Sequence, residues 1–75
     1  MKLEAIFSEV FQIPASDVAD DLRFDSIGSW DSLTHMILIG RLEESFAVQL
    51  SGDEIADMRT VGDARCSMRR HGAAV

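Results

Sequence analysis

The stretch from Leu33 to Phe46 most restricts how this chain can fold, because its apolar residues occupy two faces of a helix. At about 100° per residue, one of these faces holds Leu38, Ile39, Leu42 and Phe46, together with His35. The roughly opposite face holds Leu33, Met36, Ile37 and Gly40. A surface helix needs only one apolar stripe, so the second face must be buried, lie in a membrane or meet a partner.

The length of the chain decides among these three possibilities. We expect its 75 residues to form one domain, residues 1–75, whose thin core cannot easily surround a helix. No run approaches the roughly 18 apolar residues of a membrane span, and the N-terminal segment lacks a signal-peptide core. We therefore predict a cytoplasmic protein without membrane insertion, whose second face meets a partner. In the alternative, Leu33 and Met36 pack under the preceding loop and leave only Ile37 exposed.

Helical periodicity and capping signals predict the other elements. A first helix has its apolar residues at Leu3, Ile6, Phe7, Val10 and Phe11, and Pro14 prevents its continuation. Ser51 and Glu54 form a capping box that opens a short helix to Met58, and Thr60 and Asp63 repeat the signal more weakly. The last helix places Val61, Ala64 and Met68 on one side, and Gly72 ends it. The predicted fold is all-α, a small four-helix bundle of three longer helices and one short helix, with a long first loop.

The long first loop, residues 15–30, is polar and contains four aspartates. Three apolar residues, Leu22, Phe24 and Ile27, interrupt it and are expected to hold it against the core. A calcium site is disfavoured because oxygen ligands do not recur at alternate positions and no glutamate closes the loop. We predict no metal site. A connection this long in a small domain tends to be functional.

The charge balance favours basic protein partners over nucleic acid. The formal net charge is −6, from 13 acidic and 7 basic side chains, and such a chain repels phosphates and anionic lipids. In the alternative, the acidity only keeps a small protein soluble. The single cysteine, Cys66, excludes an intramolecular disulfide. We expect a monomer.

Ser32 stands where the polar loop turns into the second helix, with Asp31 or Ser29 as the cap. Its hydroxyl lies beside the unpaired N–H groups and positive dipole end of that helix, a favourable place for a phosphate. Three interpretations are open: a first-turn serine, a nucleophile with His35 and Asp31, or the attachment point of a phosphorylated arm. The nucleophile is disfavoured because Asp31 cannot readily orient the far nitrogen of His35. No catalytic residue is predicted.

Several motifs together resemble the acyl carrier proteins. They are Gly28-Ser29-Trp30-Asp31-Ser32-Leu33, Leu42-Glu43-Glu44-Ser45-Phe46 and Thr60-Val61-Gly62-Asp63, and the resemblance extends from Leu3 to Met68. In that family the serine of Asp-Ser-Leu carries 4′-phosphopantetheine. The resemblance implies that a phosphopantetheinyl transferase, using coenzyme A and Mg²⁺, attaches this arm to Ser32. The arm's thiol would hold an acyl or aminoacyl group as a thioester for acyl-loading and acyl-transfer enzymes, and the chain itself would not be an enzyme.

The resemblance also implies a partner-binding surface around the second helix. Its predicted residues are Asp31, Leu33, Met36, Ile37, Glu43 and Glu44. The residues Ser29, Trp30, Thr34, Ile37 and Arg41 depart from the usual fatty acid carrier and make the early helix less acidic. They favour a carrier of a specialised polyketide, lipid, amino acid or envelope-modification pathway. The alternative function is an unmodified helical interaction module that docks a partner through Leu33, Met36 and Ile37.

Two further residues have open interpretations. Trp30 either anchors the loop in the core or covers the base of the arm. Gly40 costs the second helix about 1 kcal/mol relative to alanine. Either a tight contact between helices or the close approach of a partner or of the arm would explain this glycine.

Overall fold

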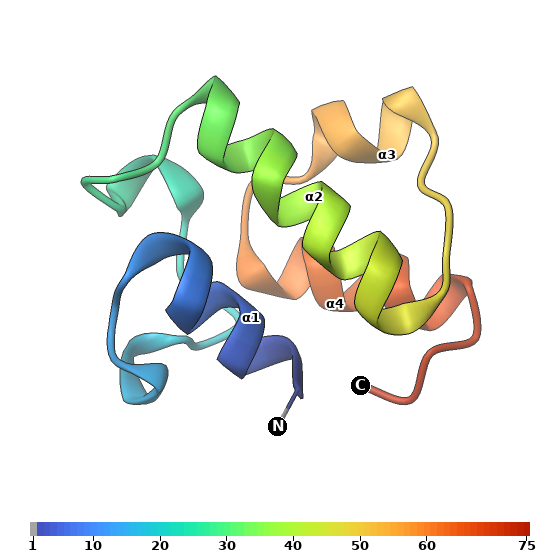
Figure 1. The fold of residues 1–75 in the computed structure, drawn as a ribbon, viewed down its shortest axis with the longest axis horizontal. Coiled ribbons are helices and arrows are strands. Elements are labelled where there is room, and N and C mark those ends of the chain that lie inside the picture. The colour runs from blue at the N-terminus through green and yellow to red at the C-terminus, as the bar shows by residue number, and fades with distance from the viewer. Residues whose placement is uncertain (1) are drawn as a thin grey trace.

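The computed structural model describes residues 2–75, which form four α-helices and two short 3₁₀ helices (Figure 1). In chain order these elements are α1 (Lys2–Phe11), η1 (Ala15–Asp17), η2 (Phe24–Ser26), α2 (Ser32–Phe46), α3 (Gly52–Asp57) and α4 (Val61–Arg70). The predicted all-α bundle of three longer helices and one short helix is confirmed. The one bridge of strand type in residues 2–75 pairs Arg23 with Thr60.

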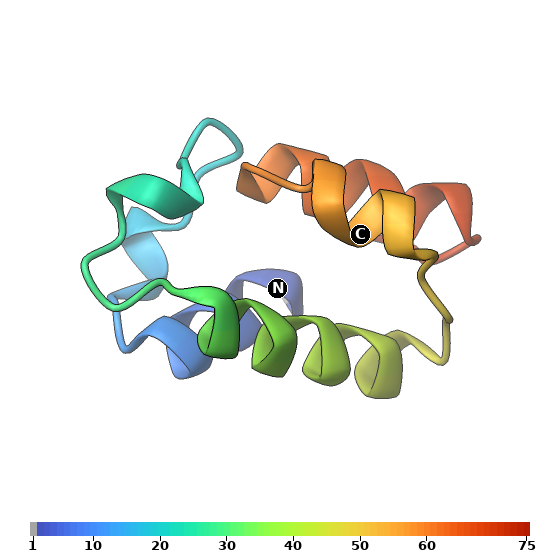
Figure 2. The same cartoon turned by 90° about the horizontal axis from the view of Figure 1, so that it is seen from above.

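The helices form two layers around one hydrophobic core. Figure 2 shows α1 beside α2 in one layer and α3 beside α4 in the other. Phenylalanines from α1 and η2 meet at the centre, where the rings of Phe7 and Phe24 lie 5.6 Å apart. The most deeply buried side chains are Leu3, Phe7, Phe11, Phe24, Leu38, Ile39, Leu42, Val61, Ala64 and Met68. Val10 is only partly buried at the edge of this core.

Local capping fixes where three of the helices begin. Asp31 caps α2 through a reciprocal pair with Thr34, whereas the Ser29 hydroxyl donates to the carbonyl of Phe11 instead. The predicted capping boxes of α3 (Ser51 with Glu54) and α4 (Thr60 with Asp63) are both present. Each box pairs the orphan N–H groups of a first helical turn with oxygen atoms three residues away. These starts are therefore set by local sequence.

The long first loop is fastened to the segment that follows α3. The Phe24 N–H donates to the carbonyl of Arg59 over 2.9 Å, and the Val61 N–H donates to the carbonyl of Leu22 over 3.1 Å. Phe24 and Ile27 are buried and Leu22 is partly buried, as predicted. The two 3₁₀ helices and this backbone pairing were not predicted. They hold the residues before Ser32 against the opposite layer.

The second apolar face of α2 is open to solvent. Leu33, Met36 and Ile37 expose 70%, 56% and 47% of their surface, the largest exposed apolar side chains of residues 2–75. The alternative in which the loop covers Leu33 and Met36 is therefore wrong. The interpretation of Gly40 as the site of a tight contact between helices is also wrong, because a Cβ there would meet nothing within 4 Å. This leaves an apolar surface that no part of the described chain covers.

Candidate functional site

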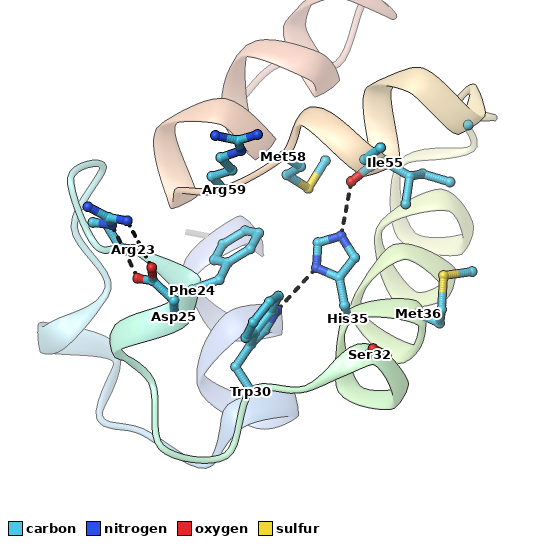
Figure 3. Close-up of a pocket in the computed structure, with 12 residues that line it drawn as sticks. Arg23, Phe24, Asp25, Trp30, Ser32, His35, Met36, Ile55, Met58 and Arg59 are labelled. Carbon is cyan, nitrogen blue, oxygen red and sulfur yellow. Dashed lines mark hydrogen bonds and ion pairs between the residues drawn. The ribbon is translucent and has the colours of Figure 1, made fainter.

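A groove of about 740 Å³ lies between η2, the first turns of α2, and α3 (Figure 3). Its apolar lining comes from three elements and their flanks, with the side chains Phe24, Trp30, Met36, Ile55 and Met58. Polar side chains lie at both ends. Ser32 lies at one end, and Arg23, Asp25 and Arg59 lie at the other.

Ser32 is the first residue of α2, and its side chain is exposed at the mouth of the groove. Asp31, which precedes it, accepts the Thr34 N–H at 2.8 Å, and the Asp31 N–H donates to the Thr34 hydroxyl at 2.7 Å. The Thr34 N–H and hydroxyl hold the pKa of Asp31 below its ordinary value, so this carboxylate is charged at neutral pH. The serine hydroxyl is thus presented at a rigid helix start, beside first-turn N–H groups that suit an anion.

His35 connects the three walls of the groove. The Trp30 indole N–H donates to Nδ1 of His35 over 3.2 Å, and Nε2 of His35 lies 3.1 Å from the carbonyl oxygen of Ile55 (Figure 3). An indole N–H only donates, so Nδ1 is the acceptor, and Nε2 carries the proton and donates to Ile55. We call this Trp30–His35–Ile55 chain the His35 strut.

The His35 strut bears on two interpretations of the sequence. Both ring nitrogens of His35 have partners other than Ser32, so the histidine is not oriented to activate that hydroxyl. Trp30 is partly buried against the core and also lines the groove near Ser32. Trp30 is therefore an anchor of the loop on the core, and a role as a cover for the base of the arm stays a prediction.

The residues predicted for partner binding do not share one environment. Leu33, Met36 and Ile37 are exposed together on α2, and Glu44 is exposed further along it. Glu43 is partly buried, and its Oε2 accepts the Leu50 N–H over 2.8 Å. Glu43 therefore has a structural contact at the C-terminal end of α2 that the sequence did not indicate.

The groove also contains three charged residues that the sequence analysis missed. Arg23 and Asp25 belong to the first loop, whereas Arg59 lies far along the chain, after α3. The pairing of Arg23 with Thr60 brings the two segments together. No local sequence signal marks such a pairing. Within residues 2–75, no group of three or more His, Cys, Asp or Glu side chains could hold a metal ion. In the same part of the chain, no helix has the length and apolar character needed to cross a membrane.

Comparison with known sequences identifies the family. The sequence model of the family described as "Phosphopantetheine attachment site" matches residues 2–64, which is most of the chain. This chain belongs to the acyl carrier protein family. The carrier is 39% identical over 62 residues to an acyl carrier protein of Acidothermus cellulolyticus, a match that covers 83% of this chain and 74% of that protein.

A second relative and a solved structure extend this likeness. The carrier is 34% identical over 73 residues to the non-reducing polyketide synthase stbA of Stachybotrys bisbyi, covering 97% of this chain but 3% of the synthase. The solution NMR structure of holo acyl carrier protein from Geobacter metallireducens superposes with a TM-score of 0.82 at 29% identity. That match covers 92% of this chain and 79% of the other chain.

Membership of the family fixes the general role. The cofactor is a covalent 4′-phosphopantetheine, and the carrier works with phosphopantetheinyl transferases and acyl-handling enzymes rather than as a catalyst itself. A phosphorylated arm needs an accessible hydroxyl, donors for its phosphate and room for its length. The exposed Ser32, the first turn of α2 and the adjoining groove meet these three needs.

Proposed function

We propose that Ser32 is the attachment point of the 4′-phosphopantetheine arm and that this carrier presents acyl or aminoacyl thioesters to a set of biosynthetic enzymes. The observation that carries the proposal is the exposed Ser32 hydroxyl at the N-terminus of α2, at the mouth of the groove. When bound, the arm supplies a terminal thiol that holds the cargo as a thioester. We also propose that residues 1–75 act as one monomeric carrier domain in the cytoplasm.

The loading reaction requires little of the chain beyond presentation of this hydroxyl. The Ser32 oxygen forms a bond to the pantetheine-bearing phosphorus of coenzyme A, and the bond from that phosphorus to the bridging oxygen of the pyrophosphate breaks. The adenosine 3′,5′-bisphosphate leaves, and the hydroxyl proton goes to a base of the transferase, which also holds Mg²⁺. Asp31 keeps the start of α2 in place during this step. The first-turn N–H groups then face the phosphodiester charge.

We propose that partner enzymes dock on one surface of α2, which we call the docking face. It comprises Asp31, Leu33, Met36, Ile37, Glu43 and Glu44. The exposure of three large apolar side chains beside Ser32 supports this proposal, because a monomeric protein rarely leaves such side chains together without a partner. The acids add attraction for basic partner surfaces. The Oε2 atom of Glu43 accepts the Leu50 N–H, so Glu43 contributes through its other carboxylate oxygen.

We propose a specialised pathway rather than general fatty acid synthesis. Ile37 is exposed where acids recur in the fatty acid carriers, and Arg41 adds a positive charge to α2. Arg41 also forms an ion pair with Glu9 of α1, so the negative charge of Glu9 is less available to a partner. The likeness to a polyketide synthase over nearly the whole chain points in the same direction.

Intact-mass analysis tests the attachment. After incubation with coenzyme A, Mg²⁺ and a broad-specificity transferase, we expect a gain of one phosphopantetheine, about 340 Da. Ser32→Ala should abolish the gain. Ser16→Ala, which removes an exposed hydroxyl on η1, should retain it. No gain with several transferases would overturn the proposal and favour the unmodified interaction module that docks through Leu33, Met36 and Ile37.

A further inference from the structure

The far end of the groove contains one positive charge without an internal partner. Arg23 is neutralised there, because its Nε and Nη2 donate to the two carboxylate oxygens of Asp25 over 3.2 and 2.8 Å. Arg59 is exposed, and no ion pair to its guanidinium occurs within residues 2–75. In a protein of net charge −6, this leaves one cation without an ion pair at this end of the groove.

The floor of the groove is closed toward the core. Phe24 and Met58, which line the groove, expose only 1% and 4% of their surface, and Leu38 of α2 exposes 0%. Beside them, the His35 strut ties the loop and α3 to α2. A long alkyl chain that entered the core past His35 would break these two hydrogen bonds and leave part-buried polar atoms without partners, which is unfavourable.

Ser32 and Arg59 line opposite ends of the same groove (Figure 3). The backbone of the arm from phosphate to thiol compares with about four extended residues, on the order of 14 Å. An arm that starts at Ser32 and lies along the groove directs its terminal group toward the end that contains Arg59.

We propose that the groove receives a short acyl group that ends in a carboxylate, with Arg59 as the partner of that carboxylate and the His35 strut as the barrier to long alkyl chains. This inference rests on the proposed attachment at Ser32. A guanidinium binds a carboxylate through two parallel hydrogen bonds, whereas a neutral acyl group of similar size gains nothing there. Because Arg59 is exposed, salt should weaken the contact.

Loading with three coenzyme A thioesters tests the inference. The broad-specificity transferase places malonyl, butyryl or dodecanoyl arms on ¹⁵N-labelled protein, and intact mass verifies each product. We expect malonyl loading to shift the side-chain Nε–H signal of Arg59 and butyryl loading to leave it near its position in the carrier with the free arm. Arg59→Gln should abolish the malonyl-specific shifts in the groove. Arg70→Gln, which removes an exposed arginine of α4 outside the groove, should preserve them.

The dodecanoyl form tests the barrier. We expect no shift of the Leu38 and Leu42 amide signals in the native carrier, and we expect such shifts in His35→Val, where the strut is absent. Equal effects of malonyl and butyryl would overturn the role of Arg59. Core shifts on dodecanoyl loading of the native carrier would overturn the barrier. Failure of every thioester to load would instead refute attachment at Ser32, so the two proposals fail in distinguishable ways.

Discussion

The indole N–H of Trp30 donates to Nδ1 of His35 over 3.2 Å, and the two rings meet edge to face with centroids 6.0 Å apart. This contact selects one neutral tautomer of the histidine, in which the Nε2 proton points to the carbonyl of Ile55. A loop residue, a residue of α2 and a residue of α3 are thereby connected next to Ser32. The shape of the groove depends on this connection.

Replacing Trp30 with phenylalanine should loosen the groove without unfolding the protein. Phenylalanine keeps an aromatic ring against the core but lacks the N–H donor, so we expect a loss of about 1 kcal/mol in the free energy of unfolding. Without the indole donor, Nδ1 of His35 loses its partner, while Nε2 still donates to the carbonyl of Ile55. Denaturant titration measures the first effect, and the imidazole ¹⁵N shift of Nδ1 measures the second. An unchanged Nδ1 shift in the variant would contradict the contact with Trp30.

The ion pair between Glu4 and Arg65 should make stability depend on acid pH. Arg65 donates to Glu4 over 2.6 Å, and this hydrogen bond holds the pKa of Glu4 below its ordinary value near 4.5. A depressed pKa in the folded state stabilises the protein above the unfolded-state pKa, and that stabilisation is lost as the pH falls through the folded-state pKa. Glu4→Gln should lower the free energy of unfolding at neutral pH by about 1–2 kcal/mol and flatten its decline below pH 4.5.

A second ion pair provides the matched control for Glu4. Glu9 pairs with Arg41, but the two side chains expose 61% and 43% of their surface, against 21% and 11% for Glu4 and Arg65. Water screens an exposed pair, so Glu9→Gln should change stability by no more than about 0.5 kcal/mol. Chemical denaturation between pH 3 and 7 separates the two variants. Equal losses in both would show that burial does not strengthen the Glu4 pair.

The features that sequence predicted correctly are those determined within a few residues. Ser51 and Glu54, like Thr60 and Asp63, lie three positions apart, so the polypeptide brings them together whatever the tertiary fold. The two faces of α2 follow from helical periodicity alone. The prediction that Ser32 lies at the start of a helix also depends only on neighbouring residues.

The features that sequence missed depend on contacts between distant segments. The backbone pairing of Arg23 with Thr60 places Arg59 at the groove, and no residue pattern specifies that pairing. The contact of Glu43 with the Leu50 N–H depends on how the chain turns after α2. Periodicity put His35 on the inner side of α2, but its hydrogen bonds required the positions of both the loop and α3.

Gly40→Ala should stabilise the carrier. A Cβ at Gly40 meets nothing within 4 Å, and alanine favours a helix interior by about 1 kcal/mol over glycine. The same exchange at Gly72 should have the opposite sign, because its φ of +88° is strained for alanine. Thermal unfolding of both variants checks this pair. If Gly40 exists to admit a partner, Gly40→Ala should also raise the KM of the transferase while stability increases.

Glu44→Lys should slow productive encounter with the transferase and leave the fold intact. Glu44 is exposed, and no hydrogen bond or ion pair of its carboxylate occurs in residues 2–75, whereas reversal of Glu43 would also break the contact with Leu50. Surface charges act mainly on the association rate, so we expect kcat/KM to fall several-fold at low salt and the difference to shrink as salt screens the charges.

Asp17→Lys makes the same charge change at an exposed site on η1, outside the docking face. Both variants therefore have the same net charge, and any difference between them reflects position rather than total charge. We expect Asp17→Lys to reduce kcat/KM less than Glu44→Lys at every salt concentration. Equal reductions would indicate that the carrier's overall negative charge attracts the transferase, and that the acids of α2 have no special place in docking.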